Sequence, residues 1–164
     1  MGNRTKARAR ALQVLYAWEL RGRKEGLRAV DRELTAPGER PLSADVRAYA
    51  NRLMETIEAH RDELDDRIQG LAENWRLARM TTVDRNILRI AAAEMMYIDE
   101  IPPRVALHEA LRLAEWFGTD ESRRFINGVL DALLRELQPG RPRDDQGPGR
   151  GGGPGRGDHA EGGA

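Results

Sequence analysis

The chain has 164 residues, a length that suits one domain. Lys and Arg together number 27, as do Asp and Glu, so the formal net charge is zero and only local clusters of charge can point to a nucleic-acid partner. The absence of cysteine excludes a disulfide scaffold, a thiolate metal site and a cysteine nucleophile.

The first predicted helix runs from Thr5 to about Arg21, and Gly22 ends it. Apolar residues recur every three or four positions along it, which is the spacing of one face of a helix. This stripe consists of Ala7, Ala11, Val14, Leu15 and Trp18. The pattern predicts that one side of the helix packs against the rest of the domain.

Further helices are predicted between residues 27 and 71. A short one covers 27–34, and the segment 37–41 after it contains the proline and glycine typical of a loop. Ser43 is a favourable N-cap for the next helix, because its side-chain oxygen can accept a hydrogen bond from a free backbone N–H. The apolar pattern continues to Leu71, with a break predicted near His60.

A strongly apolar helix follows at residues 83–96. Thr81 and Asp84 in front of it have the spacing of a capping box, with Asp in place of the usual Glu. Apolar residues cover so much of its surface that it is predicted to be the central, buried helix. Met96 and Tyr97 close this helix and are interpreted as packing residues.

Two more helices complete the predicted fold. The prolines of 101–103 end the central helix and start the next one, since proline fits a first helical turn. Gly118 closes that helix. Thr119 or Asp120 is predicted to cap a last helix that ends at Leu137.

The chain divides into two parts of different composition. Residues 138–164 are rich in Gly and Pro with interspersed Arg and acidic residues, so they cannot bury apolar surface and are predicted to form a disordered tail. Residues 1–137 show helical periodicity and no strand of alternating period. The predicted fold class is all-α, a compact bundle of about seven helices.

The sequence offers no constellation of catalytic residues. It has no glycine-rich phosphate loop before a helix and no nucleophile elbow. His60, His108 and His159 are far apart in sequence and form no pair of zinc ligands at short spacing. We therefore predict a protein that is not an enzyme and uses neither a metal nor another cofactor.

No segment is predicted to enter a membrane. No apolar run approaches the roughly 20 residues that span a bilayer. The basic N-terminus is not followed by the hydrophobic stretch of a secretory signal. The sequence predicts a cytoplasmic protein without a membrane partner.

The N-terminal basic run is the local feature that stands out. Arg4, Lys6, Arg8 and Arg10 occur with no acidic residue before position 19. On a helix, Lys6 and Arg10 fall close to Gln13 and away from the apolar stripe. Such a side can bind phosphates and base edges, or it can be a basic surface that only keeps the chain soluble.

Three sequence blocks resemble the NusB family. ARARALQVLYAWEL is similar to the Arg-rich opening helix of that family, and VDRNILRIAAAEMMY resembles its central helix. IPPRVALHEALRLAEWFGTDESRRFINGVLDALL resembles its closing signature of a prolyl turn and two helices. Two positions depart from the pattern, since His108 stands where the family usually has Asn and Arg124 where it usually has Lys.

The resemblance implies two packed helical subdomains and a role in bacterial transcription antitermination. It implies binding to single-stranded boxA RNA of ribosomal leader transcripts together with the ribosomal small-subunit protein NusE, and assembly with RNA polymerase and other Nus factors. Self-association into a homodimer also occurs in the family. The positions that the resemblance assigns to RNA are Arg4, Lys6, Arg8, Arg10, Gln13, Tyr16, Glu121, Ser122, Arg123 and Phe125. Those that it assigns to NusE are Asp84, Arg85 and Glu109.

Aromatic rings can stack on the bases of single-stranded RNA. Tyr16 lies on the flank between the apolar and polar sides of its helix and is the better candidate. Phe125 lies on an apolar stripe, so it is either a stacking or a core residue. Trp75 precedes Arg76 and Arg79, and it too could be either a stacking or a core residue.

Three other residues are interpreted as structural. Trp18 and Trp116 fall on apolar stripes and are predicted to lie in the core. Gly128 interrupts the last predicted helix, where glycine costs about 1 kcal/mol relative to alanine. It is predicted to allow another helix to approach closely.

Two alternatives to an RNA-binding transcription factor remain. The same fold occurs as the leading, non-catalytic recognition domain of some RNA cytosine methyltransferases. The chain could also be a protein-only helical adaptor. If the basic side of the first helix binds RNA, Arg8→Ala and Arg10→Ala should weaken boxA binding and change stability by no more than about 0.5 kcal/mol.

Overall fold

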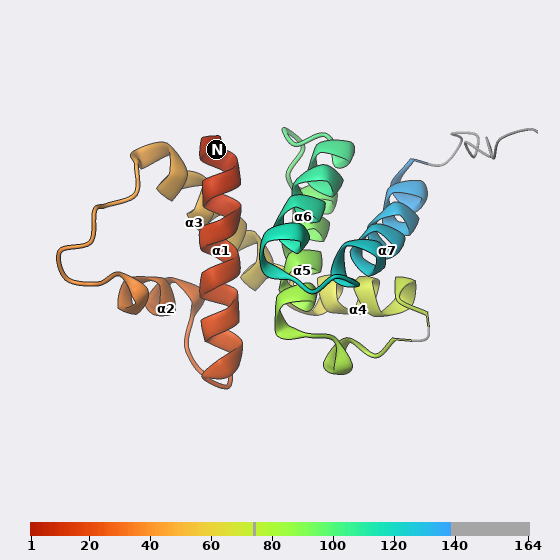
Figure 1. Cartoon of the computed structure of the whole chain (residues 1–164), viewed down its shortest axis with the longest axis horizontal. Coiled ribbons are helices and arrows are strands. Elements are labelled where there is room, and N and C mark those ends of the chain that lie inside the picture. The colour runs from red at the N-terminus through yellow and green to blue at the C-terminus, as the bar shows by residue number, and fades with distance from the viewer. Residues whose placement is uncertain (74, 139–164) are drawn as a thin grey trace, which may run out of the picture.

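The computed structural model describes residues 1–73 and 75–138. In this part of the chain, seven α-helices and one short 3-10 helix are present and there are no strands, so the predicted all-α fold class is confirmed (Figure 1). The helices are α1 (Asn3–Leu20), α2 (Leu27–Leu34), α3 (Ala44–Ala59), α4 (Arg61–Leu71), η1 (Leu77–Arg79), α5 (Thr82–Tyr97), α6 (Pro103–Phe117) and α7 (Ser122–Leu137). The predicted tail lies outside the described residues, apart from Gln138.

The helices form two groups that meet along α1 and α5. Helices α1, α2 and α3 lie on one side, and α4 to α7 lie on the other (Figure 1). Helix α5 packs against α1, α3, α4, α6 and α7. The prediction that the apolar segment 83–96 is the central helix is confirmed, because all residues from Asp84 to Met95 are buried.

Local sequence signals set several helix ends. Gly22 has a φ of 77° and follows the last turn of α1, where a left-handed conformation favours glycine. The Gly22 N–H donates to the Glu19 carbonyl and the Arg23 N–H to the Trp18 carbonyl, the two bonds of a Schellman motif. The predicted N-cap at Ser43 is confirmed, because its hydroxyl accepts from the Val46 N–H at 3.4 Å.

Only one of the two hydrogen bonds of the capping box predicted at α5 is present. The Thr81 hydroxyl accepts from the Asp84 N–H at 3.1 Å. Among the described residues, Oδ1 of Asp84 is a buried atom without a hydrogen-bond partner. The side chain of Asp84 therefore does not complete the reciprocal bond that a longer Glu at this position makes in a capping box.

The predicted cap of α7 is wrong. The helix begins at Ser122, and neither Thr119 nor Asp120 caps it. Instead, the Ser122 hydroxyl accepts from the Thr119 N–H at 2.8 Å and so braces the turn from α6. A Cβ atom at Gly118 would lie 2.6 Å from the Ser122 side chain and 2.7 Å from the Ala114 carbonyl oxygen, so this tight turn requires glycine.

A buried cluster of ion pairs joins the two groups of helices at the base of α1. The carboxylate of Glu19 accepts hydrogen bonds from the guanidinium groups of Arg85 and Arg89 on α5. Arg89 is fully buried and donates to both carboxylate oxygens of Asp65 on α4, at 2.7 and 3.0 Å. Burial by itself would raise the pKa of Glu19, but the bonds and charges of the two arginines outweigh it and lower that pKa to about 2.

Two of the three structural interpretations are wrong. Trp18 is buried as predicted. Trp116 is 44% exposed, because the buried side of α6 runs through Ala110, Leu113 and Ala114 and its ring lies outside that side. Gly128 is exposed, and a Cβ atom there would meet nothing within 4 Å, so no helix packs against it.

Candidate nucleic-acid interface

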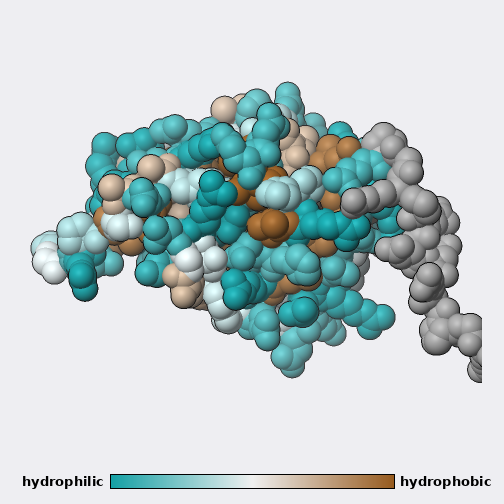
Figure 2. All heavy atoms as spheres, turned by 90° about the horizontal axis from the view of Figure 1, so that it is seen from above, coloured by the Kyte–Doolittle hydropathy of each residue, from teal (hydrophilic) through white to brown (hydrophobic). Residues whose placement is uncertain are grey.

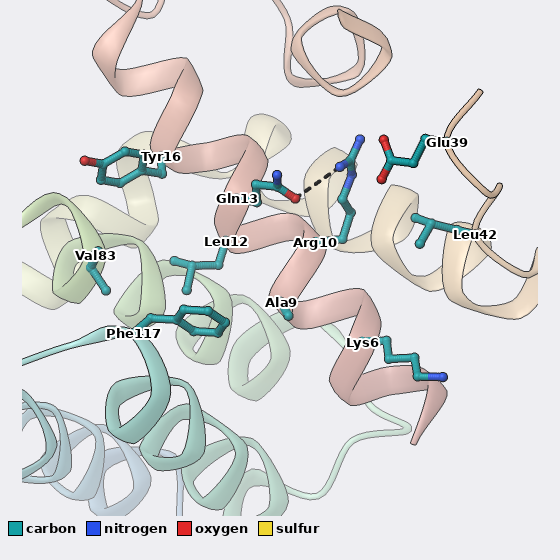
Figure 3. Close-up of a pocket in the computed structure, with 10 residues that line it drawn as sticks. All are labelled: Lys6, Ala9, Arg10, Leu12, Gln13, Tyr16, Glu39, Leu42, Val83 and Phe117. Carbon is teal, nitrogen blue, oxygen red and sulfur yellow. Dashed lines mark hydrogen bonds between the residues drawn. The ribbon is translucent and has the colours of Figure 1, made fainter. Parts of the chain in front are cut away.

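An open groove of about 570 Å³ runs along the outer side of α1 (Figure 3). One wall comes from the loop between α2 and α3, and the other from the start of α5 and the end of α6. The groove is lined by Lys6, Ala9, Arg10, Leu12, Gln13, Tyr16, Glu39, Leu42, Val83 and Phe117. We call this surface the α1 groove.

The α1 groove combines aromatic rings with a polar edge. Tyr16 is 42% exposed and Phe117 is 50% exposed, an unusual exposure for large rings on a small domain. The ring of Phe117 lies beside Leu12 and Val83, while Lys6 and Gln13 lie further along α1 (Figure 3). Lys6 is exposed and forms no ion pair with any described residue, so its ammonium group is available to an anion.

Arg10 lines the α1 groove with most of its hydrogen-bonding capacity already used. Its guanidinium pairs with Asp31 on α2 at 2.7 Å and donates to the Gln13 amide at 3.1 Å and the Thr35 hydroxyl at 3.0 Å. The side chain is only 9% exposed. Arg10 therefore attaches α2 to α1 and orients Gln13, and it offers a ligand one edge of its guanidinium at most.

The expectation that Arg8 lies on the exposed side of α1 is wrong. Arg8 is 2% exposed and donates to both carboxylate oxygens of Glu94 on α5, at 2.7–3.0 Å. Tyr49 of α3 donates to the same carboxylate, and Glu109 of α6 lies 3.5 Å from the guanidinium. A buried arginine is retained only with such a partner, so Arg8 joins three helices and is unavailable to a ligand.

This buried pair also shifts pKa values. Burial would lower the pKa of the Arg8 guanidinium, but the hydrogen bond and charge of Glu94 raise it above its ordinary value. Burial raises the pKa of the Tyr49 hydroxyl, and the negative charge of Glu94 adds to this effect. Arg8 therefore stays positively charged and the Tyr49 hydroxyl stays neutral near neutral pH.

Arg4 lies one helical turn before Arg8 and is exposed. Its guanidinium lies 5.4 Å from the centre of the Tyr49 ring, within the range of a cation–π interaction. It forms no ion pair with a described residue. Arg4 and Lys6 are therefore the two accessible positive charges of the predicted basic run.

The second group of predicted RNA residues, at the start of α7, lies outside the α1 groove. Glu121 and Arg123 are exposed, and Arg123 lies 3.3 Å from the carboxylate of Glu115. Ser122, which the resemblance assigns to RNA, is buried in the turn that it braces. Phe125 is half-buried and makes an edge contact with the ring of Trp75.

The residues predicted to face a protein partner are largely internal. Arg85, which the resemblance assigns to NusE, is buried and donates to Glu19 and to the carbonyls of Leu77 and Met80. Asp84 is also buried, in the first turn of α5. Glu109 keeps a side chain that is 15% exposed, and it accepts from the Thr5 hydroxyl at 2.9 Å.

The NusB family model matches residues 5–135, which is most of the chain. The chain belongs to the NusB family. The transcription antitermination proteins NusB of Desulforudis audaxviator and Acidothermus cellulolyticus are 43% and 45% identical to it, over 85% and 81% of the chain and 98% and 88% of their own lengths. The NusB of Chloroherpeton thalassium is 36% identical over 83% of the chain, which spans 63% of that relative.

Solved NusB structures share the fold. The structure of T. maritima NusB has a TM-score of 0.71 at 31% identity and covers 81% of this chain and 91% of its own. The crystal structure of the antitermination factors NusB and NusE in complex with dsRNA has a TM-score of 0.70 at 28% identity and covers 83% and 98%. The predicted resemblance to the family is therefore confirmed.

Six groove residues of this NusB-family chain were missed by sequence reasoning, namely Ala9, Leu12, Glu39, Leu42, Val83 and Phe117. Glu39 and Leu42 lie in a loop, where periodicity carries no information. Val83 and Phe117 have the helical spacing of core residues, yet each lies at a helix end where packing stops. The cluster Trp116-Phe117 before a glycine was the available signal for Phe117, because two large rings at a helix end are hard to bury together.

The described residues contain neither a metal site nor a membrane-spanning helix. Within residues 1–73 and 75–138, no group of three or more His, Asp or Glu side chains is placed to hold a metal ion. No helix in the same residues is long and apolar enough to cross a membrane.

Proposed function

We propose that this chain is a non-catalytic transcription antitermination factor. It binds the boxA element of ribosomal RNA leader transcripts along the α1 groove, acts together with the ribosomal protein NusE, and joins RNA polymerase with other Nus factors. Family membership and the similarity to a NusB–NusE–dsRNA complex support this proposal.

The pair of exposed rings in the α1 groove is the observation that carries the proposal. Tyr16 and Phe117 are too exposed to contribute much to the core. Unpaired bases expose faces that stack on such rings, at about 1–3 kcal/mol for each base. Lys6 and Arg4 supply charge for phosphates, and Gln13 supplies an amide that can bond a base edge.

The geometry favours single-stranded over double-stranded RNA. The bases of an A-form duplex are stacked on each other and cannot lie against aromatic side chains. An open groove with a Tyr on α1 and a Phe on α6 suits a strand whose bases are splayed out. A duplex of the same sequence should therefore compete weakly with the single strand.

The proposal is tested by titrating the full chain with a boxA-containing leader fragment, with and without NusE. Tyr16→Ala should weaken binding by about 5- to 150-fold, the loss of one stacked base, and Tyr16→Phe should keep most of the affinity. Leu20→Ala, which removes an exposed apolar residue outside the groove, serves as the control. Unchanged affinity of Tyr16→Ala would reject the α1 groove as the RNA site.

We propose that Asp84 and Glu109 contact NusE and that Arg85 does not. The Oδ1 atom of Asp84 has no hydrogen-bond partner among the described residues, so a donor from a partner protein could satisfy it after a small adjustment. Arg85 already donates to three internal groups. Asp84→Ala should weaken NusE binding and leave the affinity for RNA alone unchanged, which a calorimetric titration of each ligand can measure.

A further inference from the structure

Trp75 is a large exposed side chain that the α1 groove does not include. It is 57% exposed and lies just before η1, in the connection between α4 and α5. Its ring meets the ring of Phe125 on α7 edge to face, with centroids 5.6 Å apart and an interplanar angle of 60°. Phe125 supports the Trp75 ring from one side and leaves the rest of it open to solvent.

The backbone that carries Trp75 is held in place. The side-chain amide of Gln69 donates to the Trp75 carbonyl and accepts from the Leu77 N–H, both at 2.7 Å. Arg85 donates to the carbonyls of Leu77 and Met80 at 2.8 and 2.9 Å. An aromatic ring on so fixed a segment is preorganised, so little conformational entropy is lost when a ligand stacks on it.

Unpaired positive charge surrounds this ring pair. Arg76 and Arg79 adjoin Trp75, and Arg124 adjoins Phe125; all three are exposed, and none forms an ion pair with a described residue. Other arginines of α4 and α7 are paired, namely Arg67 with Glu136, Arg123 with Glu115 and Arg135 with Asp131. We call Trp75, Phe125 and these three free arginines the η1 platform.

The η1 platform lies at the same end of the molecule as the aromatic end of the α1 groove. Val83 lines the groove in the first turn of α5, and η1 directly precedes that turn. Phe117 lines the groove at the end of α6, and Phe125 lies in the next helix, just after the short turn (Figure 1). The α6–α7 turn therefore connects the Phe117 end of the groove to the helix that carries Phe125, the ring that Trp75 contacts.

We propose that the η1 platform is a second RNA contact, at which Trp75 stacks on an unpaired base beyond those held in the α1 groove. Arg76, Arg79 and Arg124 bind the phosphates on either side of that base. This inference rests on the proposed RNA-binding function. A ring flanked by free guanidinium groups suits a polyanion with exposed bases, because the ring can stack on a base while the guanidinium groups bind the phosphates beside it.

The test compares three single-stranded RNAs with the full-length protein. One is the boxA segment alone, and the other two carry several unpaired nucleotides added at the 5′ or the 3′ end. The wild-type chain should bind one extended RNA more tightly than the short one, by about 5- to 150-fold for one added stack. Trp75→Ala should abolish this gain and leave the short-RNA affinity unchanged, and Trp75→Phe should restore most of it.

Matched charge variants sharpen the comparison. Arg79→Ala should reduce the affinity for the extended RNA, whereas Arg104→Ala should not, because Arg104 is an equally exposed and unpaired arginine at the other end of α6. Quenching of tryptophan fluorescence by the extended RNA should shrink in Trp75→Ala, since stacking on a base quenches the indole.

Three results would overturn the inference. They are an extended RNA that binds no more tightly than the short one, a Trp75→Ala variant that keeps the gain, and a Trp75→Ala variant that loses the same factor on short and extended RNA. The proposed function fails by a different result, namely short-RNA affinity that Tyr16→Ala does not change. The two failures are therefore distinguishable in one set of titrations.

Discussion

The inner and outer sides of α1 both carry charged side chains, but they use them for opposite purposes. On the inner side, Arg8 and Glu19 are buried and pair with α5. On the outer side, Lys6 and Tyr16 are exposed and face an open groove. The comparison teaches that a basic run on one helix is not one surface, because some of its cations hold the fold together and others remain available to a ligand.

The same contrast is visible across the whole molecule. Seen from above, its surface is mostly hydrophilic, with small hydrophobic patches near the middle (Figure 2). Many surface arginines are neutralised by a neighbouring carboxylate, such as Arg52 by Glu100 and Arg28 by Glu55. The zero net charge of the chain therefore conceals arginines and lysines without an ion-pair partner among the described residues, and the cations that we assign to RNA, such as Lys6 and Arg79, belong to this group.

The largest effect on stability is expected from a substitution that removes a buried ion pair on the inner side of α1. Arg8→Ala leaves the buried carboxylate of Glu94 with Tyr49 as its remaining close partner. Removing one member of a buried ion pair costs about 3–5 kcal/mol, so the free energy of unfolding should fall by that amount in urea denaturation. Lys6→Ala, its control two positions away, should change it by no more than about 0.5 kcal/mol. Equal stabilities of the two variants would contradict the division of α1 into two sides.

Lowering the pH should remove the stability that the Glu19 carboxylate contributes on the inner side of α1, and it should do so within a defined pH range. The folded-state pKa of Glu19 is about 2, below its ordinary 4.5, so its contribution to stability is present above about pH 4.5 and is lost as the pH falls toward 2. The shift corresponds to a contribution on the order of 3 kcal/mol. Urea denaturation at several pH values should show Glu19→Gln less stable than wild type at pH 7, with a gap that narrows below pH 4.5. A gap independent of pH would mean that the charge of Glu19 is not what stabilises the fold.

A gain in stability is expected on the outer surface of α7. Gly128 is exposed in the middle of a helix, and a Cβ atom there would meet nothing within 4 Å. Gly128→Ala should therefore raise the free energy of unfolding by about 1 kcal/mol through helix propensity alone. A loss of stability in thermal unfolding would show instead that the helix needs glycine at this position.

The smallest effect is expected at the free cation of the α1 groove. Lys6→Ala removes one phosphate contact, so the slope of the logarithm of RNA affinity against that of salt concentration should become shallower by roughly 0.7. Filter binding at several salt concentrations measures this slope. Arg8→Ala, where it folds, should keep the wild-type slope because its charge is internal. A slope that Lys6→Ala leaves unchanged would remove Lys6 from the RNA site.

The helices and their ends were predictable because their signals are local. Apolar spacing places α1, α3 and α5, and Ser43, Thr81 and Gly22 form the predicted caps and stop. Each of these features depends on residues within a turn or two of one another. Part of the α1 groove also followed from the sequence, since Lys6, Gln13 and Tyr16 share a side of one helix.

The sequence by itself determined the all-α fold, the family and the outer side of α1. Only the tertiary structure decided that Arg8 is internal, because its partner Glu94 lies 86 residues away on α5. It also decided that Phe117 ends up in a groove and that Trp75 rests on Phe125. The physical reason is that helical periodicity reports which side of a helix a residue lies on, whereas burial of a charge or exposure of a ring depends on which other helix packs there.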